Sequence, residues 1–150
     1  YQAGRVPATR VLYAGMVNES KELVIDGRRY TMKPPIFKIH RLRFGDDEPI
    51  LLEVRYIAVD LCSAIARQDL TGSLYGIYET ACGLQLTEIK QRITSIILDE
   101  STKQFFNLNE PTPGLLIEGV TFIGKETLLE MEHSIYRGDT YQFTVTATSG

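Results

Sequence analysis

The chain has 150 residues, of which 43% are hydrophobic and 23% are charged, so it has the size and composition of one globular domain with a single core. No apolar run approaches the roughly 18 residues of a membrane-spanning helix, and no signal peptide is recognisable. A formal net charge of −3 argues against a nucleic-acid-binding surface on this segment. The chain starts at Tyr1 without a methionine and ends in a polar tail, so we interpret it as a fragment of a longer protein.

The first part of the chain is predicted to be mostly extended, because β-branched and apolar residues are frequent and turn residues separate them. The expected elements are, in order, a strand at Thr9–Val17, a turn over residues 21–25 (KELVI) capped by Ser20 and ending near Gly27, a connection closed by Pro34 and Pro35, and two strands within residues 38–58 that flank the acidic turn GDDE. The two strands around the acidic turn form a predicted hairpin.

The middle of the chain carries the predicted helices. Residues 60–70 are helix-like and end at a Thr-Gly break. A second helix starts at Ser73, and its apolar residues recur at i, i+3, i+4, i+7 and i+8, which places them on one face. Gly83 is a typical residue for the C-terminal end of a helix. We therefore expect this helix to pack against the rest of the domain.

One cysteine precedes the predicted second helix, and the other lies on the apolar face of that helix. Cys62 and Cys82 are both surrounded by apolar residues, as buried free thiols usually are. We interpret them as buried thiols of a protein in the reducing cytoplasm rather than as a disulfide. A disulfide between them is the alternative that the sequence leaves open.

The last third of the chain is again predicted to be mostly extended. The expected elements are a strand at Leu84–Leu98, a short helix starting at Ser101, a loop at Pro111–Pro113, and strands at Leu115–Ile123, Leu128–Tyr136 and Tyr141–Thr148. Helices are few and most strands follow one another through short turns. This order favours an α+β fold with a mainly antiparallel sheet flanked by short helices over alternating βαβ units.

The predicted hairpin carries an unusual pair of charges. Arg41 and Arg43 are two residues apart on a strand, so their side chains share one face. The pairing that keeps the apolar residues of both strands together puts Glu53 beside these arginines. One interpretation is a solvated ladder of ion pairs, which contributes little stability. The other is an anion site, because guanidinium groups match the oxygens of phosphate or carboxylate in two-point geometry.

The start of the second helix has features that favour the anion site. Unpaired backbone N–H groups at a helix N-terminus attract anions, and Ser73 stands at this position. Gly76 is unfavourable within a helix, and the close approach of a ligand would give it a purpose. Tyr75 lies outside the apolar face, so its hydroxyl can point the same way as Ser73. The alternative is that Ser73 is only an N-cap.

Three stretches together resemble a known family. They are HRLRFGDDEPILLE at 40–53, GSLY at 72–75, and the segment E-x5-YRGDTYQF from Glu130 to Phe143. The sequence resembles the UTRA effector-binding domain of GntR-type bacterial transcription regulators of the HutC branch, across nearly the whole chain. The resemblance implies the chorismate-lyase-like fold for residues 1–150. It also implies an N-terminal winged-helix DNA-binding domain that is absent from this chain.

Within this branch the chain is most similar to regulators of amino-sugar use, whose effector is a phosphorylated hexosamine. By this resemblance, the phosphate is bound by Arg41, Arg43, Ser73 and Tyr75, and the sugar by Glu53, Glu130 and Tyr136. One departure is KELVIDGRRYTMKPP, which replaces the small-residue helix and glycine turn usual in the family. The resemblance therefore does not define the edge of the pocket that this stretch would form. Taken without it, Glu130 would be an exposed carboxylate and Tyr136 a half-buried packing residue.

The resemblance also implies partners and a mode of action. The regulator is expected to be a cytoplasmic homodimer without membrane contact, which binds operator DNA only through the missing domain and is a repressor released by its ligand. No catalytic set and no metal-ligand spacing is present, so we expect no enzyme activity, metal or cofactor. The alternatives are a chorismate-lyase-like enzyme, a regulator domain that binds a non-phosphorylated carboxylate, and a dimerisation module with an empty pocket.

Overall fold

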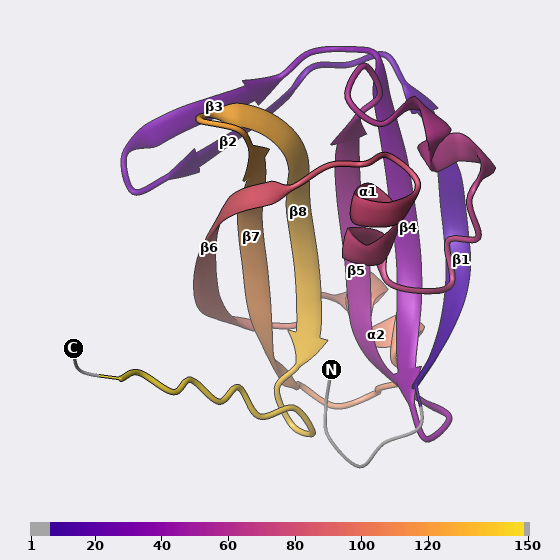
Figure 1. Cartoon of the computed structure of the whole chain (residues 1–150). Helices are drawn as coiled ribbons and strands as arrows, with labels where there is room; N and C mark the ends of the chain where they lie inside the picture. The colour runs from indigo at the N-terminus through magenta and orange to yellow at the C-terminus, as the bar shows by residue number, and fades with distance from the viewer. Residues whose placement is uncertain (1–6, 149–150) are drawn as a thin grey trace.

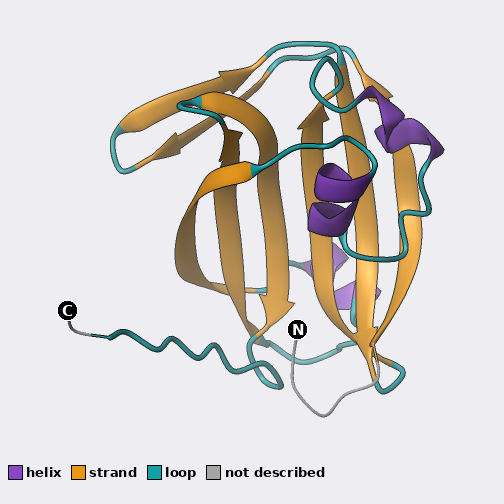
Figure 2. Cartoon of the chain, viewed as in Figure 1, coloured by secondary structure: helices purple, strands orange, loops and turns teal. Residues whose placement is uncertain are grey.

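The computed structural model describes residues 7–148, which form one large sheet, a separate hairpin and three short helical segments (Figure 1; Figure 2). The strands are β1 (Pro7–Val17), β2 (Lys21–Ile25), β3 (Arg28–Met32), β4 (Ile36–Gly45), β5 (Glu48–Ala58), β6 (Leu86–Ile97), β7 (Pro113–Ile123) and β8 (Thr127–Arg137). The helical segments are the 3₁₀ helix η1 (Ser63–Arg67) and the α-helices α1 (Leu74–Thr80) and α2 (Glu100–Phe105). None of these helices has the length and apolar character needed to span a bilayer.

Six strands form the large sheet in the order β1–β4–β5–β8–β7–β6, with every neighbouring pair antiparallel. The two hairpins β2–β3 and β4–β5 turn on residue pairs with positive φ. These are Asp26 (54°) with Gly27 (77°), and Asp46 (52°) with Asp47 (66°). Such angles are typical of tight two-residue hairpins, where Asp and Gly are common. The predicted α+β class with a mainly antiparallel sheet is confirmed.

Helical segments and the small hairpin cover both faces of the sheet (Figure 1). On one face, α1 lies in front of β4 and β5, and η1 lies in front of the upper part of β1, beside β4 (Figure 1). The core on this face consists of Phe37, Ile39, Ile57, Cys62, Ile65, Leu70, Leu74, Tyr78 and Leu129. On the other face, the β2–β3 hairpin packs on one end of the sheet around Met131, and α2 packs on the other end around Leu42 and Phe106. The predicted site residues of β4 and β5 lie on the face that α1 covers.

Some local predictions are wrong. Residues 21–25 form strand β2 rather than a capped turn, because they pair with β3 across the Asp26–Gly27 turn. Residues 60–70 contain only the 3₁₀ segment η1, since the backbone returns to an extended conformation at Gln68. The helix expected at Ser101 begins one residue earlier, because the Asp99 side chain caps it by accepting a hydrogen bond from the Thr102 N–H at 2.8 Å.

Residues 141–148 are not a strand, although their alternating pattern predicts one. The preceding strand, β8, already has β5 on one side and β7 on the other, so the chain leaves the sheet with no free edge beside it. Figure 1 shows this segment, which we call the tail, running away from the sheet in an extended form.

The two cysteines form a disulfide, which corrects the expectation of free thiols. The Cα atoms of Cys62 and Cys82 lie 5.3 Å apart, because the end of α1 packs beside the start of η1. The bond closes a loop between residues 20 positions apart, and this loop contains the whole of α1 and the segment before it. The two cysteines are brought together by the packing of apolar residues that are distant in the sequence. The local sequence around each cysteine does not reveal this packing.

We expect reduction of the disulfide to lower the free energy of unfolding by about 3 kcal/mol, because the unfolded chain regains the freedom of a loop of this length. Urea unfolding with and without dithiothreitol measures the change, and a thiol assay on the unreduced, denatured protein should detect no free thiol. Two reactive thiols, or equal stability in both conditions, would contradict the assignment.

Candidate functional site

The candidate site is built on the β4–β5 hairpin, whose register follows the prediction. Arg41 lies opposite Glu53, and Leu42 lies opposite Leu52. A bulge after Arg43 shifts the register only near the turn. Because side chains alternate along a strand, Arg41, Arg43 and Glu53 all face the side of the sheet that α1 covers.

A cavity of about 510 Å³ lies between this face and the segment that leads into α1. Its lining combines charged side chains of β4 and β5 with the start of α1, the end of β8 and the beginning of β1. The lining residues are Pro7, Ala8, Thr9, Arg41, Arg43, Leu51, Glu53, Arg55, Thr71, Gly72, Ser73, Leu74, Tyr75 and Tyr136. Six of the seven predicted site residues are among them. The seventh, Glu130, is buried behind the lining.

Arg41 is 1% exposed and connects the sheet to the segment before α1. Its Nε and Nη2 atoms contact Glu53 Oε1 at 2.6 and 2.5 Å. Its Nη1 atom donates to the carbonyl oxygens of Leu70 at 2.9 Å and Gly72 at 2.7 Å. One guanidinium group therefore neutralises a buried carboxylate and also satisfies two backbone acceptors, which fixes the position of the loop that leads to Ser73.

Arg55, on the next strand, is the centre of the charge network. Its Nε atom donates to Glu53 Oε2 at 2.9 Å, and its Nη1 atom donates to Glu130 Oε1 at 2.6 Å. Its Nη2 atom lies 3.1 Å from Glu132 Oε2. The guanidinium carbon also sits 5.3 Å from the ring centroid of Tyr75, in cation–π geometry. The floor of the cavity is thus a chain of alternating charges in which both oxygens of Glu53 bind arginine.

The two buried glutamates differ in their acidity. Burial alone would raise the pKa of Glu53, but the guanidinium groups of Arg55 and Arg41 outweigh burial and hold this pKa below its ordinary value. Burial raises the pKa of Glu130, and the contacts from Arg55 and Tyr78 do not fully offset it. Glu53 is therefore the firmly ionised carboxylate, whereas Glu130 is protonated more readily than an exposed glutamate.

The start of α1 brings two more predicted residues to the cavity. Ser73 is the N-cap of the helix, since its Oγ atom accepts a hydrogen bond from the Gly76 N–H at 3.2 Å, and it also lines the cavity. The Tyr75 hydroxyl accepts a hydrogen bond from Arg55 Nη1 at 3.4 Å. Burial raises the pKa of Tyr75, so its hydroxyl keeps its proton at neutral pH. Ser73 thus both caps α1 and lines the cavity.

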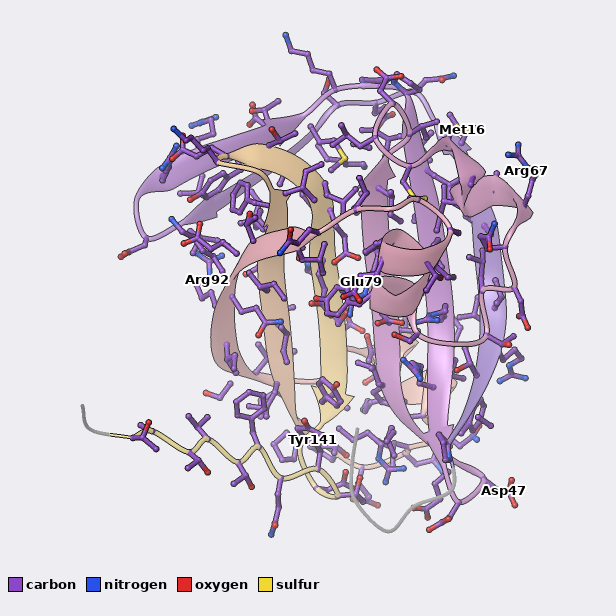
Figure 3. All side chains as sticks on the ribbon, viewed as in Figure 1. Met16, Asp47, Arg67, Glu79, Arg92 and Tyr141 are labelled. Atoms are coloured by element: carbon purple, nitrogen blue, oxygen red, sulfur yellow. A yellow bond between two sulfur atoms is a disulfide. The ribbon has the colours of Figure 1, made fainter. Side chains whose placement is uncertain are left out.

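Tyr136 closes the cavity from the end of β8 and is coupled to the tail. Its ring stacks on that of Tyr141, with centroids 4.0 Å apart. Burial raises the pKa of Tyr136 well above its ordinary value, which keeps its hydroxyl protonated and able to donate a hydrogen bond. Tyr141 is the residue labelled at the base of β8 in Figure 3.

The sequence prediction omits three members of the charge network. Arg55 shares a face with Arg41 and Glu53 by simple alternation, so the pattern contains the signal for it. Glu132 shares a face with Glu130 in the same way. Tyr78, whose hydroxyl donates to Glu130, occupies the apolar face of α1, where an aromatic residue indicates only packing. Helix periodicity does not reveal its polar role.

Comparison with known proteins identifies the family. Residues 2–142 match the model of the UTRA domain. The chain is a UTRA domain. Such domains occur in regulators of the GntR family. This UTRA domain resembles the crystal structure of a GntR-family transcriptional regulator from Enterococcus faecalis, with a TM-score of 0.73 at 20% identity. The match covers 93% of this chain and 99% of that structure.

Among curated proteins, the UTRA domain is similar to the HTH-type transcriptional repressor NagR of Bacillus subtilis, with 26% identity over 141 residues. The match covers 93% of this chain but only 57% of NagR, so the chain spans little more than half the length of that relative. A solved structure with the same fold is the effector domain of PhnF from Mycobacterium smegmatis, with a TM-score of 0.75 at 18% identity, over 97% of the chain and 90% of that structure.

We expect the Glu53→Gln substitution to lower the free energy of unfolding by roughly 3–5 kcal/mol at neutral pH, because it leaves two buried guanidinium groups without their shared carboxylate. The pKa of Glu53 is lower in the folded state than in the unfolded state. Its stabilising effect is therefore complete above the unfolded pKa of about 4.3 and is lost as the pH falls through the folded pKa.

Urea unfolding of both proteins between about pH 3 and pH 7 tests this expectation. Glu79→Gln, at an exposed position of α1, is the matched control and should change stability by less than about 0.5 kcal/mol. A difference between wild type and Glu53→Gln that stays constant over this pH range would contradict the assigned ionisation of Glu53.

Proposed function

We propose that this UTRA domain binds a phosphorylated amino sugar, of the hexosamine-phosphate class, in the cavity between β4, β5 and α1. The observation that carries the proposal is the charge of the lining, which contains three arginines and a single glutamate. Guanidinium groups that line one cavity favour an anionic ligand, and the further carboxylates that pair with Arg55, those of Glu130 and Glu132, lie outside the lining. The sequence resemblance to regulators of amino-sugar use supports the sugar as the rest of that ligand.

In this proposal, Arg43 is the principal phosphate-binding residue. Arg41 is buried and binds Glu53 and two backbone carbonyls, whereas Arg43 is half-buried and lines the cavity from the next position on the same face. Arg41 contributes its charge and holds the loop in place. The hydroxyls of Ser73 and Tyr75 line the same cavity and complete the phosphate site.

The proposed sugar contacts come from Glu53 and Tyr136, which both line the cavity. Glu130 is 1% exposed and does not line it, but it contacts Arg55, which does. We therefore assign Glu130 an indirect role, in which it positions Arg55, in place of the direct sugar contact that the sequence resemblance implies. This assignment follows from position, since Glu53 lines the cavity, whereas Glu130 does not line it and binds the Arg55 guanidinium group from behind the lining.

The proposal extends to the whole protein of which this domain forms a part. A DNA-binding domain would precede it, and the regulator would be a cytoplasmic homodimeric repressor that releases operator DNA when the effector binds. Regulation of this kind requires that the effector bind two arrangements of the protein with different affinity. The name of NagR as an HTH-type transcriptional repressor supports this reading.

The same arginines would also bind a carboxylate, so the proposal needs a test that distinguishes a phosphate from a carboxylate.

Among residues 7–148, no group of three or more His, Cys, Asp and Glu side chains is arranged to bind a metal ion. Incubation with chorismate tests the enzyme alternative, since any product formed from it would overturn a purely sensory role.

We expect glucosamine 6-phosphate or its N-acetylated form to bind at least 100-fold more tightly than the unphosphorylated sugar, because the phosphate supplies two or more charge-assisted hydrogen bonds. Isothermal titration calorimetry with each compound measures the difference. Equal affinity for the two forms, or binding only of non-phosphorylated carboxylates, would reject the phosphosugar.

The Arg43→Ala substitution should weaken binding of the phosphosugar about 10- to 100-fold, which corresponds to roughly 1.5–3 kcal/mol for a lost charged hydrogen bond. Arg67→Ala is the control, because Arg67 is exposed at the end of η1 and does not line the cavity. Calorimetry on both variants, together with circular dichroism to establish that they fold, gives the comparison. Unchanged affinity of a folded Arg43→Ala variant would count against the phosphate site.

A further inference from the structure

The Cys62–Cys82 disulfide encloses one wall of the cavity. Five of the residues that line the cavity, at 71–75, lie in the chain between the two cysteines. They include Ser73 and Tyr75, which the proposed function assigns to the phosphate. The other lining residues come from β1, β4, β5 and β8, which lie outside this loop. The bond therefore constrains the wall at α1 and leaves the wall formed by the sheet unconstrained.

Helix α1 depends on contacts with the rest of the molecule. It has seven residues, with no acidic side chain in its first turn and no basic one in its last turn. So short a helix is not stable on its own in water, and no side-chain charge of its own stabilises its dipole. Before its start, Arg41 donates to two carbonyl oxygens of the loop, and in its middle Tyr78 donates to Glu130. Beyond its end, the disulfide ties Cys82 to Cys62.

The two cysteines differ in their access to solvent. Cys62 is 1% exposed, whereas Cys82 is half-buried and lies between the exposed residues Ala81 and Gly83. Apart from the neighbours of Gly83 in the chain, no atom of residues 7–148 lies within 4 Å of the position that a Cβ atom would take at this glycine. A thiol from solvent therefore approaches the bond from the side of Cys82, and exchange with a disulfide depends on such access.

A disulfide is unusual in the setting that the proposed function implies. Disulfides are rare in the reducing cytoplasm, and those found there are usually transient bonds that sense redox state or take part in catalysis. The proposed regulator is cytoplasmic, and both cysteines of its effector domain are in this bond. Because the bond ends the helix that forms one wall of the cavity, a change in its redox state acts on the proposed effector site.

On the basis of the function proposed above, we propose that the Cys62–Cys82 bond is a thiol–disulfide exchange site, at which a dithiol reductant lowers the affinity of the cavity for its effector. One thiolate of the dithiol attacks the Sγ atom of Cys82, and Cys62 leaves with the electron pair and takes up a proton. The second thiolate then attacks the reductant's own sulfur in the mixed disulfide, and Cys82 leaves and takes up a proton. The protein gains two electrons and two protons, and the reductant becomes a disulfide.

Reduction removes the constraint beyond the end of α1 and leaves the one at Arg41 in place. The wall at 71–75 then populates arrangements in which its groups no longer meet the phosphate. The apparent affinity falls in proportion to the fraction of molecules that keep the competent arrangement. Because such coupling is reciprocal, bound effector protects the disulfide from reduction by the same factor.

Calorimetry with glucosamine 6-phosphate or its N-acetylated form measures this coupling on the 150-residue chain, before and after reduction by dithiothreitol. We expect the reduced chain to bind about 10-fold more weakly, as a competent fraction of about one tenth would give. Titration against mixtures of reduced and oxidised dithiothreitol, read by alkylation and mass spectrometry, should then place the midpoint about 30 mV lower with saturating phosphosugar. This shift is the same 10-fold factor for a two-electron couple.

The double variant Cys62→Ala, Cys82→Ala is the matched control. The sequence has two cysteines, so this variant should bind the phosphosugar as weakly as the reduced chain and should not respond to dithiothreitol. Equal affinity of the oxidised and reduced chains would overturn the proposal. A bond that dithiothreitol does not reduce in the folded chain would overturn it as well.

Amide ¹⁵N relaxation without ligand separates a failure here from a failure of the proposed function. Reduction should lower the order parameters of α1 from about 0.85 to below about 0.6, or introduce microsecond-to-millisecond exchange there, and leave β5 and β8 unchanged. If no phosphosugar binds the oxidised chain, the proposed function fails, and a selective effect on α1 would still support the exchange site. An unchanged α1, or loss of the native spectrum throughout the sheet, would overturn it.

Discussion

The arrangement of this domain depends on one buried series of charges, in which Glu53 lies between Arg41 and Arg55. Ions removed from water are tolerated only when each is paired and its hydrogen-bonding groups are satisfied. Here each oxygen of the Glu53 carboxylate accepts a hydrogen bond from a different arginine. The Nη1 atom of Arg41 also donates to two carbonyl oxygens of the loop before α1. The sheet, the loop and the helix are therefore held by the same few atoms.

Through this linkage, a ligand bound in the cavity would influence more than its own contacts. Arg41 fixes the loop through hydrogen bonds to the carbonyls of Leu70 and Gly72. Glu130 accepts a hydrogen bond from the hydroxyl of Tyr78, which lies on α1. An anion that attracts the guanidinium groups competes with the carboxylates that they now bind. Any redistribution of these contacts changes the forces on α1 and on the disulfide-closed loop that contains it.

The sequence predicts the features that depend on local periodicity. Alternation defines the β4–β5 register and the common face of Arg41, Arg43 and Glu53, and the apolar spacing after Ser73 identifies α1. Other features depend on distant neighbours. The Cys62–Cys82 bond requires the packing of η1 against α1, and the depth of Glu130 requires the cover of Tyr78 and Arg55.

Two errors have different causes. The strand at residues 21–25 is overlooked because Ser20 looks like a helix cap, although the Asp26–Gly27 pair is a strong hairpin signal. The tail has the alternation of a strand but no edge to pair with beside β8. Residue patterns describe what a segment is able to form, whereas the availability of a strand partner depends on the order of the strands in the sheet.

The stacking of Tyr136 on Tyr141 gives this domain a further property. One ring lines the cavity and the other begins the tail, so a bound molecule that displaced the first ring would also redirect the chain that leaves the sheet. If occupancy of the cavity alters the path of the tail in this way, thermodynamic reciprocity demands that any contact that holds the tail alter occupancy by the same factor. The affinity of the cavity would then depend on what the tail contacts.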